Sequence, residues 1–314
     1  MGILYIDRKN LEIKIIGNAL KFYINGRQEG SVPLSPLDKV VIIGNLKLET
    51  SVLHKLAQKN ISVIFLSGRR LTFRCALHGR LHNNGLLRLK QYEKSQSPFA
   101  LFFAIELIKN KLQKQVILLS ELRTSCTNHS FKIKSSISSI EEIIKKLDKQ
   151  DNIDSLRGLE GGAANRYFKA LSFVLPNSLN FKGRVKRPPG DPVNALLSLG
   201  YTMLHFEMVR EIEVIGLDPV IGFYHCFEYG RESLACDLVE PFRPDIDRFV
   251  LNIFREKIFK KNDFFESNEN GSKGYYLKKN KRKQYFDKYE EWAVDQRPKW
   301  REQVRILAWR VLNG

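Results

Sequence analysis

The sequence predicts an α+β protein in which a small, mainly β N-terminal domain (residues 1–84) precedes a larger, all-helical C-terminal domain (residues 85–314). Two observations predict this fold class. Over residues 1–80, apolar and polar residues alternate in short runs separated by turn residues, which is the period of half-buried strands. After residues 82–85 the apolar spacing changes to the 3.6-residue period of amphipathic helices. The length of 314 residues is sufficient for two such domains.

The N-terminal domain is expected to contain mostly strands and one helix. Asn25-Gly26 lies between two of the strand-like runs and predicts a tight hairpin turn. SVLHKLAQKN predicts the helix, because Val52, Leu53 and Leu56 recur at helical spacing. The predicted strands are ILYID, LEIKIIG, ALKFYI, EGSVPL, KVVIIG, ISVIFLS and LTFRCAL.

The C-terminal domain is expected to be helical almost throughout. Asp191-Pro192 predicts the start of a helix that runs to about residue 214, because Asp is a favoured N-cap and Pro is favoured in the first turn. The remainder to Gly314 is predicted to be helical apart from a polar loop over residues 262–272. The earlier segments with helical spacing are LLRLKQYEK, residues 98–120, EEIIKKLDKQ and residues 154–173.

The composition excludes several classes of protein. A hydrophobic content of 43% excludes a disordered chain, and no apolar stretch reaches the roughly 18 residues of a membrane span. The N-terminus lacks the order of a secretory signal, so the protein is expected to be cytoplasmic. The four cysteines form no CxxC pair, which argues against a disulfide framework and a cysteine-ligated zinc. The 52 Lys and Arg residues against 34 Asp and Glu residues, a net charge of +18, favour a polyanionic partner.

A short acidic segment interrupts this basic chain. Residues 211–240 contain seven carboxylates but only one cation, Arg231. Clustered carboxylates repel one another unless a cation lies among them, and a hard divalent cation is one remedy. The alternative is an acidic helix face neutralised by lysines from elsewhere.

The acidic segment supplies three candidate catalytic residues. If residues 231–240 are helical, Asp237 and Glu240 lie on one face with Ser233, and His225 can fold back beside them across Gly230. One imidazole and carboxylates with open coordination positions suit Mg²⁺ or Mn²⁺ better than Zn²⁺. A structural role is the alternative, in which Asp237 and Glu240 pair with Arg231 and Arg243.

Glu160 is the candidate for a further metal ligand. It precedes four small residues, Gly161 to Ala164, which permit the close approach of another backbone or a ligand. The alternative is a helix salt bridge to Arg157 or Arg166.

Two basic stretches are candidates for contacts with DNA phosphates. The first lies directly before the helix start at Asp191, and the second includes the aromatic residues Tyr275, Tyr276, Tyr285 and Phe286, which could stack on bases. A solvated loop is the alternative for the second stretch. The candidate DNA-contact residues are Lys182, Arg184, Lys186, Arg187, Lys278, Lys279, Lys281, Arg282 and Lys283.

The phrases LRGLEGGAANRYF, RPPGDPVNALLSLGY, GLDPVIGFYH and GRESLACDLVEPFRP, in this order, closely resemble the CRISPR-associated adaptation integrase, a metal-dependent Cas endonuclease of antiviral defence. The resemblance covers the whole chain. It implies a Mg²⁺ or Mn²⁺ site formed by Glu160, His225 and Glu240, with Asp237 at a further acidic position close to the site. Some family members have Asp where this chain has Glu240.

The resemblance also implies a reaction and partners. A free DNA 3′-OH would attack a phosphodiester at the edge of a CRISPR repeat and so insert a spacer, with His225 as a ligand rather than a general base. The substrates would be double-stranded DNA, both spacer precursor and repeat. The protein would form a homodimer, with the N-terminal domain as the dimerisation domain, and would act with a small ferredoxin-like adaptation partner and no membrane.

Two other functions stay open from the residues alone. One is a stand-alone, structure-specific nuclease that acts on branched DNA in repair with the same ligands. The other is a non-enzymatic, basic DNA-binding scaffold whose acidic segment is structural.

Overall fold

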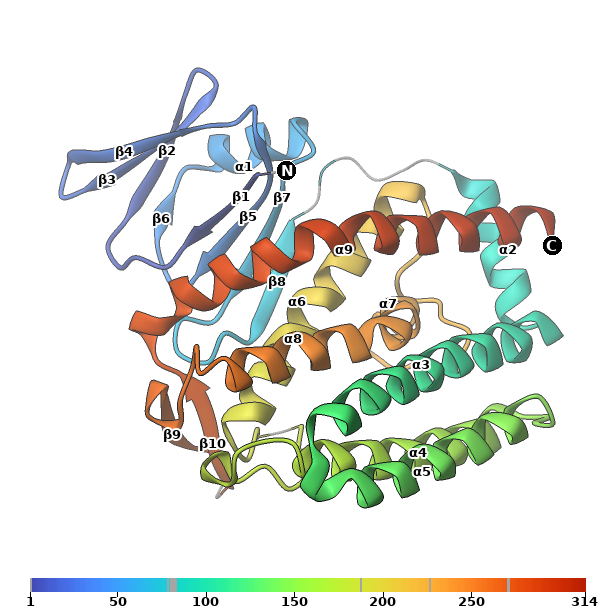
Figure 1. The fold of residues 1–314 in the computed structure, drawn as a ribbon. Coiled ribbons are helices and arrows are strands. Elements are labelled where there is room, and N and C mark those ends of the chain that lie inside the picture. The colour runs from blue at the N-terminus through green and yellow to red at the C-terminus, as the bar shows by residue number, and fades with distance from the viewer. Residues whose placement is uncertain (1, 78, 80–83, 187, 226, 270–271) are drawn as a thin grey trace. The chain divides into compact units, whose positions relative to one another are not determined.

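The computed structural model describes residues 2–77, 79, 84–186, 188–225, 227–269 and 272–314. The chain divides into two compact units (Figure 1). Unit 1 consists of residues 1–83 and Arg282–Pro298, and unit 2 of residues 84–281 and Lys299–Gly314. The long C-terminal helix α9 (Lys279–Asn313) therefore contributes to both units, whereas the sequence assigned all of it to the helical domain.

Unit 1 contains two four-stranded sheets and helix α1 (Thr50–Gln58). One sheet has the order β1-β5-β7-β8, with β1, β5 and β7 parallel and β8 antiparallel to β7. The other has the order β4-β3-β2-β6. The strands are β1 (Gly2–Ile6), β2 (Glu12–Ile16), β3 (Ala19–Ile24), β4 (Arg27–Pro33), β5 (Leu37–Ile43), β6 (Lys47–Leu48), β7 (Ser62–Leu66) and β8 (Phe73–Leu77).

The local sequence explains these strands. Asn25 and Gly26 both have positive φ, 50° and 79°, as the tight turn between β3 and β4 requires. Alternate residues, such as Leu11, Ile13 and Leu20, enter one apolar core that also takes residues from β5, α1 and β7. The seven predicted strands, the hairpin and the helix are therefore confirmed.

The α9 segment of unit 1 packs on β1 through aromatic and polar contacts. The rings of Tyr5 and Phe286 stack with centroids 4.2 Å apart, and the Tyr5 hydroxyl donates a 2.6 Å hydrogen bond to Glu290. Arg282, which is 3% exposed, donates to the carbonyl oxygens of Gly68 and Arg69 at 2.6 and 2.7 Å.

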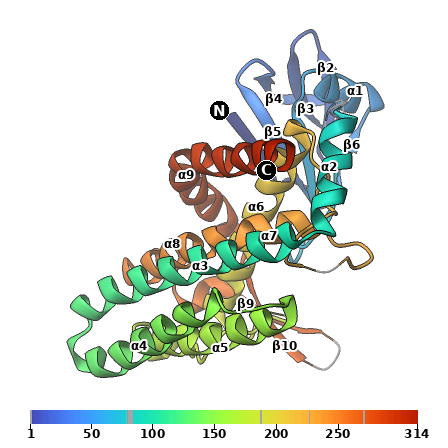
Figure 2. The same ribbon diagram turned by 90° about the vertical axis from the view of Figure 1, so that its right-hand side faces the viewer.

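Unit 2 is built mainly from helices, among which α3, α4 and α5 pack on one another (Figure 2). The helices are α2 (Gly85–Ser95), α3 (Pro98–Ser125), α4 (Ser130–Leu147), α5 (Ile153–Ser172), α6 (Pro192–Ile215), α7 (Ser233–Val239) and α8 (Arg243–Arg255). Short 3-10 turns occur at η1 (Thr127–His129), η2 (Asn177–Leu179), η3 (Glu240–Phe242) and η4 (Lys261–Asp263). None of the described helices is long and apolar enough to cross a membrane.

The predicted start of α6 is confirmed. The Asp191 carboxylate accepts a 2.8 Å hydrogen bond from the Asn194 backbone N–H, and Pro192 is the first helical residue. Helix α6 is buried along most of its length, so it forms the centre of unit 2.

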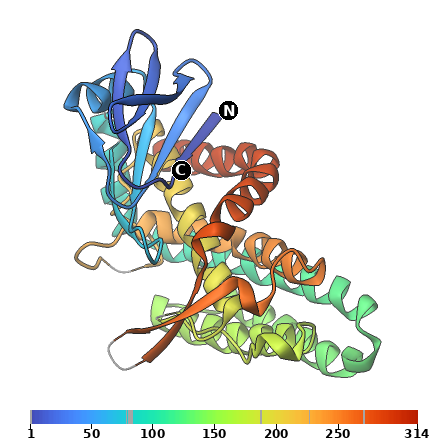
Figure 3. The ribbon, with the colours of Figure 1, turned by 90° about the vertical axis from the view of Figure 1, so that its left-hand side faces the viewer.

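Two predictions about local structure were wrong. The polar loop expected over residues 262–272 contains strand β9 (Phe264–Glu269). Strand β10 (Ser272–Leu277), which lies mostly in a segment expected to be helical, pairs antiparallel with β9 and contacts α6 (Figure 3). Burial of Phe264, Tyr276 and Leu277 explains why these strands form despite polar neighbours. Helix α7 is also shorter than expected and ends at Val239, so Glu240 begins the 3-10 turn that contains Pro241.

Candidate active site

Two predicted carboxylates, Glu160 on α5 and Glu240 on η3, meet at one ammonium group in unit 2. Lys111 Nζ, from α3, donates to Glu160 Oε1 and lies 2.6 Å from Glu240 Oε2. The side chain of Glu160 is 22% exposed, whereas those of Lys111 and Glu240 are 6% and 7% exposed. The two carboxylates therefore converge on a single cation position in a largely buried setting.

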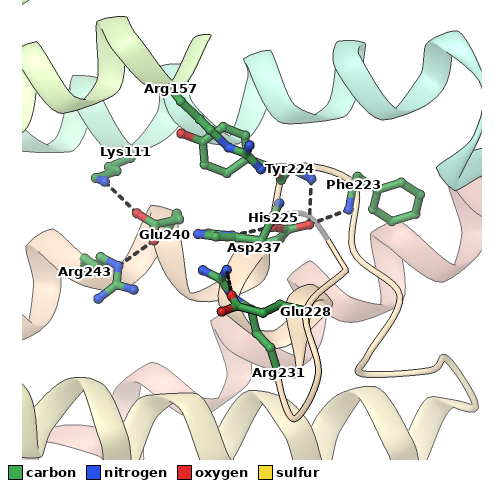
Figure 4. A network of polar contacts seen from close by, with 10 residues as sticks. All are labelled: Lys111, Arg157, Phe223, Tyr224, His225, Glu228, Arg231, Asp237, Glu240 and Arg243. Carbon is green, nitrogen blue, oxygen red and sulfur yellow. Dashed lines mark hydrogen bonds and ion pairs between the residues drawn. The ribbon is translucent and has the colours of Figure 1, made fainter. Parts of the chain in front are cut away.

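Glu240 has a second cationic partner. Arg243 lies one turn further along and donates to Glu240 Oε1 at 2.7 Å (Figure 4). Burial alone would raise the pKa of Glu240, but the cations of Arg243 and Lys111 together lower it well below its ordinary value. The pKa of Lys111 is raised, because the attraction of Glu240 and Glu160 outweighs the burial of the ammonium. Glu240 is therefore ionised throughout the physiological pH range.

Asp237 holds His225 in place from a fully buried position on α7. Asp237 Oδ2 accepts the backbone N–H groups of Phe223 and Tyr224 at 2.6 and 3.0 Å. Asp237 Oδ1 accepts the backbone N–H of His225 at 2.9 Å and its ring nitrogen Nδ1 at 2.7 Å (Figure 4). A carboxylate can only accept, so Nδ1 carries a proton, and in the neutral imidazole Nε2 carries the lone pair.

Gly222 permits the close approach of this loop to α7. A Cβ atom there would lie 2.7 Å from Asp237 Oδ2 and 2.9 Å from the Ser233 carbonyl carbon. Both distances are too short for a side chain, so glycine is required for the hydrogen bonds between the loop and Asp237. The imidazole held in this way points toward Glu240 (Figure 4).

The structure therefore brings Glu160, His225, Asp237 and Glu240 into one region, through pairings that differ in part from the structural alternatives. Glu160 pairs with Lys111, while Arg157 bonds Asp154 at 3.1 Å and the carbonyl oxygen of Tyr224 at 2.8 Å.

Of the two ion pairs expected for a purely structural role of Asp237 and Glu240, one is present and the other is not. Glu240 does pair with Arg243, as the structural alternative held. Asp237 bonds His225 instead of Arg231, and Arg231 pairs with Glu228 at 2.7 Å.

Most carboxylates of the acidic segment (residues 211–240) have cationic partners of their own. Glu211 pairs with Arg210 at 2.8 Å and with Arg301 at 3.3 Å, and Glu232 lies 3.3 Å from His205 Nε2. Among the described residues, no group of three or more His, Cys, Asp or Glu side chains is arranged to hold a metal ion. The repulsion expected within residues 211–240 is thus relieved mainly by protein cations.

Lys111 is the residue of the site that the sequence reasoning missed. A signal for it exists, because Lys111 occupies a position on the buried face of α3 between Leu107, Ile108 and Leu112. A lysine at an apolar position of a long amphipathic helix indicates a buried anionic partner.

The first basic stretch contains one residue that faces inward. Arg184 donates to Asn194 Oδ1 at 2.9 Å and to Ser198 Oγ at 3.0 Å, and its guanidinium lies 5.3 Å from the ring centre of Tyr201. The interpretation of Arg184 as a phosphate contact is therefore corrected, because its donors hold the loop on α6. Lys182 is exposed, and Arg187 lies outside the described residues.

Lys186, in the same stretch, borders the site. Burial and the cation of Arg243 lower the pKa of Lys186. The carboxylates of Glu240 and Glu160 act on it in the opposite direction. Lys186 therefore remains a candidate DNA contact close to the carboxylates.

The second basic stretch presents lysines, but of its four aromatic residues only Tyr275 is partly exposed, and its hydroxyl donates a 2.6 Å hydrogen bond to Glu266. Tyr276, Tyr285 and Phe286 are buried, so the expectation that they stack on bases was wrong. Arg282 is also buried, on backbone carbonyls, and has no surface for a phosphate. Lys281 forms a 3.2 Å ion pair with Asp263, while the candidate contacts Lys278, Lys279 and Lys283 are exposed.

The fold and site define a two-unit α+β protein whose helical unit holds two carboxylates and an oriented imidazole in one region. The sequence profile of the family described as CRISPR associated protein Cas1 matches residues 4–291. The chain is 52% identical over 314 residues to the CRISPR-associated endonuclease Cas1 1 of Thermodesulfovibrio yellowstonii, covering 100% of this chain and 98% of that protein. The chain belongs to the Cas1 family, which confirms the resemblance inferred from the sequence.

The fold agrees with solved structures. A CAS1 protein from Thermotoga maritima matches with a TM-score of 0.87 at 23% identity, over 100% of this chain and 98% of that chain. A casposase bound to integration product matches with a TM-score of 0.83 at 21% identity, over 100% and 94%. The predicted α+β class, with an N-terminal β-rich region and a larger helical part, is confirmed.

Proposed function

We propose that this chain is a DNA endonuclease and integrase of CRISPR adaptation that depends on Mg²⁺ or Mn²⁺ held by Glu160, His225 and Glu240. The observation that carries the proposal is the convergence of Glu160 and Glu240, from separate elements, on one cation position. Membership of the Cas1 family and the similarity to a named endonuclease support the activity on DNA.

The donor types of Glu160, His225 and Glu240 suit a hard divalent cation, although the three side chains are not arranged as a metal site in this structure. The two carboxylates would supply oxygen ligands, and the lone pair on Nε2 of a neutral His225 would supply a nitrogen ligand, so that such an ion could still take water and phosphate. When bound, such an ion would polarise a phosphoryl oxygen and stabilise the negative charge that develops in the transition state.

The protein side chains maintain this donor set during the reaction. The 3′-OH of the incoming strand loses its proton to water as its oxygen attacks the phosphorus, the bond to the old 3′-oxygen breaks, and that oxygen takes up a proton from water. One phosphodiester replaces another, so no ATP is required. Asp237 keeps Nδ1 of His225 protonated and Nε2 free, while Arg243 keeps Glu240 ionised. Water in place of the 3′-OH would give hydrolysis of the same bond.

The proposal includes partners. The substrate is double-stranded DNA, both spacer precursor and CRISPR repeat, and Lys182, Lys186, Lys278, Lys279 and Lys283 are proposed to contact its phosphates. We propose a homodimer that forms through unit 1. A small ferredoxin-like protein of the adaptation system completes the assembly.

Joining of a labelled oligonucleotide to supercoiled plasmid tests the proposal. Wild-type protein should join the two with Mn²⁺ and not with EDTA, and Glu160→Gln should lower the rate by at least ~10²-fold. Glu121→Gln is the matched control, because Glu121 is a half-exposed carboxylate that pairs with Arg248 on the neighbouring α8. Cutting without joining would favour the stand-alone nuclease, and DNA binding with neither activity would favour the scaffold.

A further inference from the structure

Lys111 is an ammonium group placed where the helix should be apolar. Its side chain is 6% exposed, and Leu107, Ile108 and Leu112 on the same face of α3 are buried completely or nearly so. Transfer of an ammonium out of water is strongly unfavourable unless anions replace the lost hydration. The two anions that do so are Glu160 and Glu240.

The position of Lys111 differs from that of the other cation at the site. Arg243 contacts only one of the two carboxylates, at Glu240 Oε1. Lys111 contacts both, and it uses Glu240 Oε2, the oxygen that Arg243 leaves available. Without Lys111, Glu160 and Glu240 would face each other as like charges that no cation joins.

We infer that Lys111 is a positioning residue that joins Glu160 and Glu240 before the divalent ion arrives, and that the ammonium and the divalent ion compete for the same carboxylate oxygens. This inference rests on the proposed metal site. The four charges of Lys111, Arg243, Glu160 and Glu240 sum to zero, so these four residues balance one another without a metal. A divalent ion that binds both carboxylates takes over the role of the ammonium, which can withdraw on its flexible four-carbon stem.

Lys111→Met tests the inference, because methionine keeps the length of the stem and removes the charge. In EDTA this variant should melt at a lower temperature than wild type, since the carboxylates lose the cation that joins them. In Mn²⁺ it should bind the ion about tenfold or more tightly than wild type, because the competing ammonium is absent. Isothermal titration or the EPR signal of free Mn²⁺ measures this affinity without any DNA.

Two further variants keep the test decisive. Lys111→Arg retains the charge and should keep wild-type melting and Mn²⁺ affinity within a fewfold range. Lys109→Met is the matched control, because Lys109 lies on the same helix and pairs with Asp148 at 2.7 Å. If Lys111→Met does not fold in EDTA, added Mn²⁺ should restore its folded signal, and failure of that rescue would overturn the inference.

The outcomes separate the inference from the proposed function. Mn²⁺ binding by wild type with equal or weaker binding by Lys111→Met overturns the competition and leaves the metal site intact. Unchanged melting of Lys111→Met in EDTA overturns the joining role. Absence of Mn²⁺ binding to wild type overturns the proposed metal site, and this inference with it.

Discussion

Replacement of Asp237 by Asn should abolish metal binding by His225 and reduce DNA joining, while the protein stays folded. The carboxylate accepts four hydrogen bonds, two on each oxygen. Asparagine retains one accepting oxygen, so its NH₂ group must face two former donors. If it faces Phe223 and Tyr224, two buried N–H groups lose their acceptor at about 1–3 kcal/mol each.

The other orientation is less costly and has a chemical consequence. If the NH₂ group faces His225, one backbone N–H loses its acceptor, and the imidazole can relieve the second conflict by moving its proton from Nδ1 to Nε2. The expected loss of stability is then about 1–3 kcal/mol, less than the typical total of ~5–15 kcal/mol. The protein should fold, but Nε2 would carry a proton and could not bind a metal ion.

Three measurements check this prediction. Urea unfolding should show a lower midpoint with an unchanged slope. Nitrogen NMR of labelled histidines should show one ring that changes tautomer, and DNA joining should fall by at least ~10²-fold. Asp245→Asn is the control, because Asp245 has one 2.9 Å ion pair, with Lys114, and should cost less than about 1 kcal/mol. Normal joining by Asp237→Asn would refute the role assigned to the Asp237–His225 hydrogen bond.

Three further predictions concern pH, packing and salt. Burial lowers the pKa of His205, but hydrogen bonds to Cys236 and Glu232 raise it to about 9. Its contribution of about 3 kcal/mol is therefore full below pH ~6.5 and lost as pH rises through about 9. His205→Gln should flatten the unfolding free energy over that window. Gly222→Ala should destabilise the protein by about 1–3 kcal/mol, because its Cβ would overlap Asp237, and an unchanged melt would contradict that packing. The log–log salt slope of DNA affinity should become less negative by about 0.9 for each phosphate-contacting lysine replaced by glutamine, with unchanged slopes counting against the candidates Lys278, Lys279 and Lys283.

The sequence predicted best those features that short-range patterns determine. The turn at Asn25-Gly26 and the helix start at Asp191 depend on neighbours within a few residues, and both occur as expected. The prediction of a loop over residues 262–272 was wrong. Strands β9 and β10 form because their aromatic side chains are buried, and not because of a pattern in the local sequence.

At the candidate site too, features that depend on short-range sequence could be predicted, whereas features that depend on tertiary packing could not. His225, Asp237 and Glu240 lie within 16 positions of one another, so their spacing on one short segment could be interpreted directly. Arg184 and Arg282 look like any surface cation in the sequence. Arg184 reaches interior partners only because its loop packs on α6, and Arg282 does so only because it bonds Gly68 within unit 1.

The two halves of the site differ in what holds them. Asp237 fixes His225 through hydrogen bonds within one short segment, so that half is rigid once the loop and α7 have formed. Glu160 and Lys111 reach Glu240 only when α3 and α5 pack, and the balance of their charges then sets the electrostatics. Addition of a divalent ion to this balanced set would leave excess positive charge in a largely buried region, and the phosphodiester of DNA is the anion that offsets it. The proposed metal and the proposed substrate are therefore expected to strengthen each other's binding, since each neutralises the charge that the other introduces.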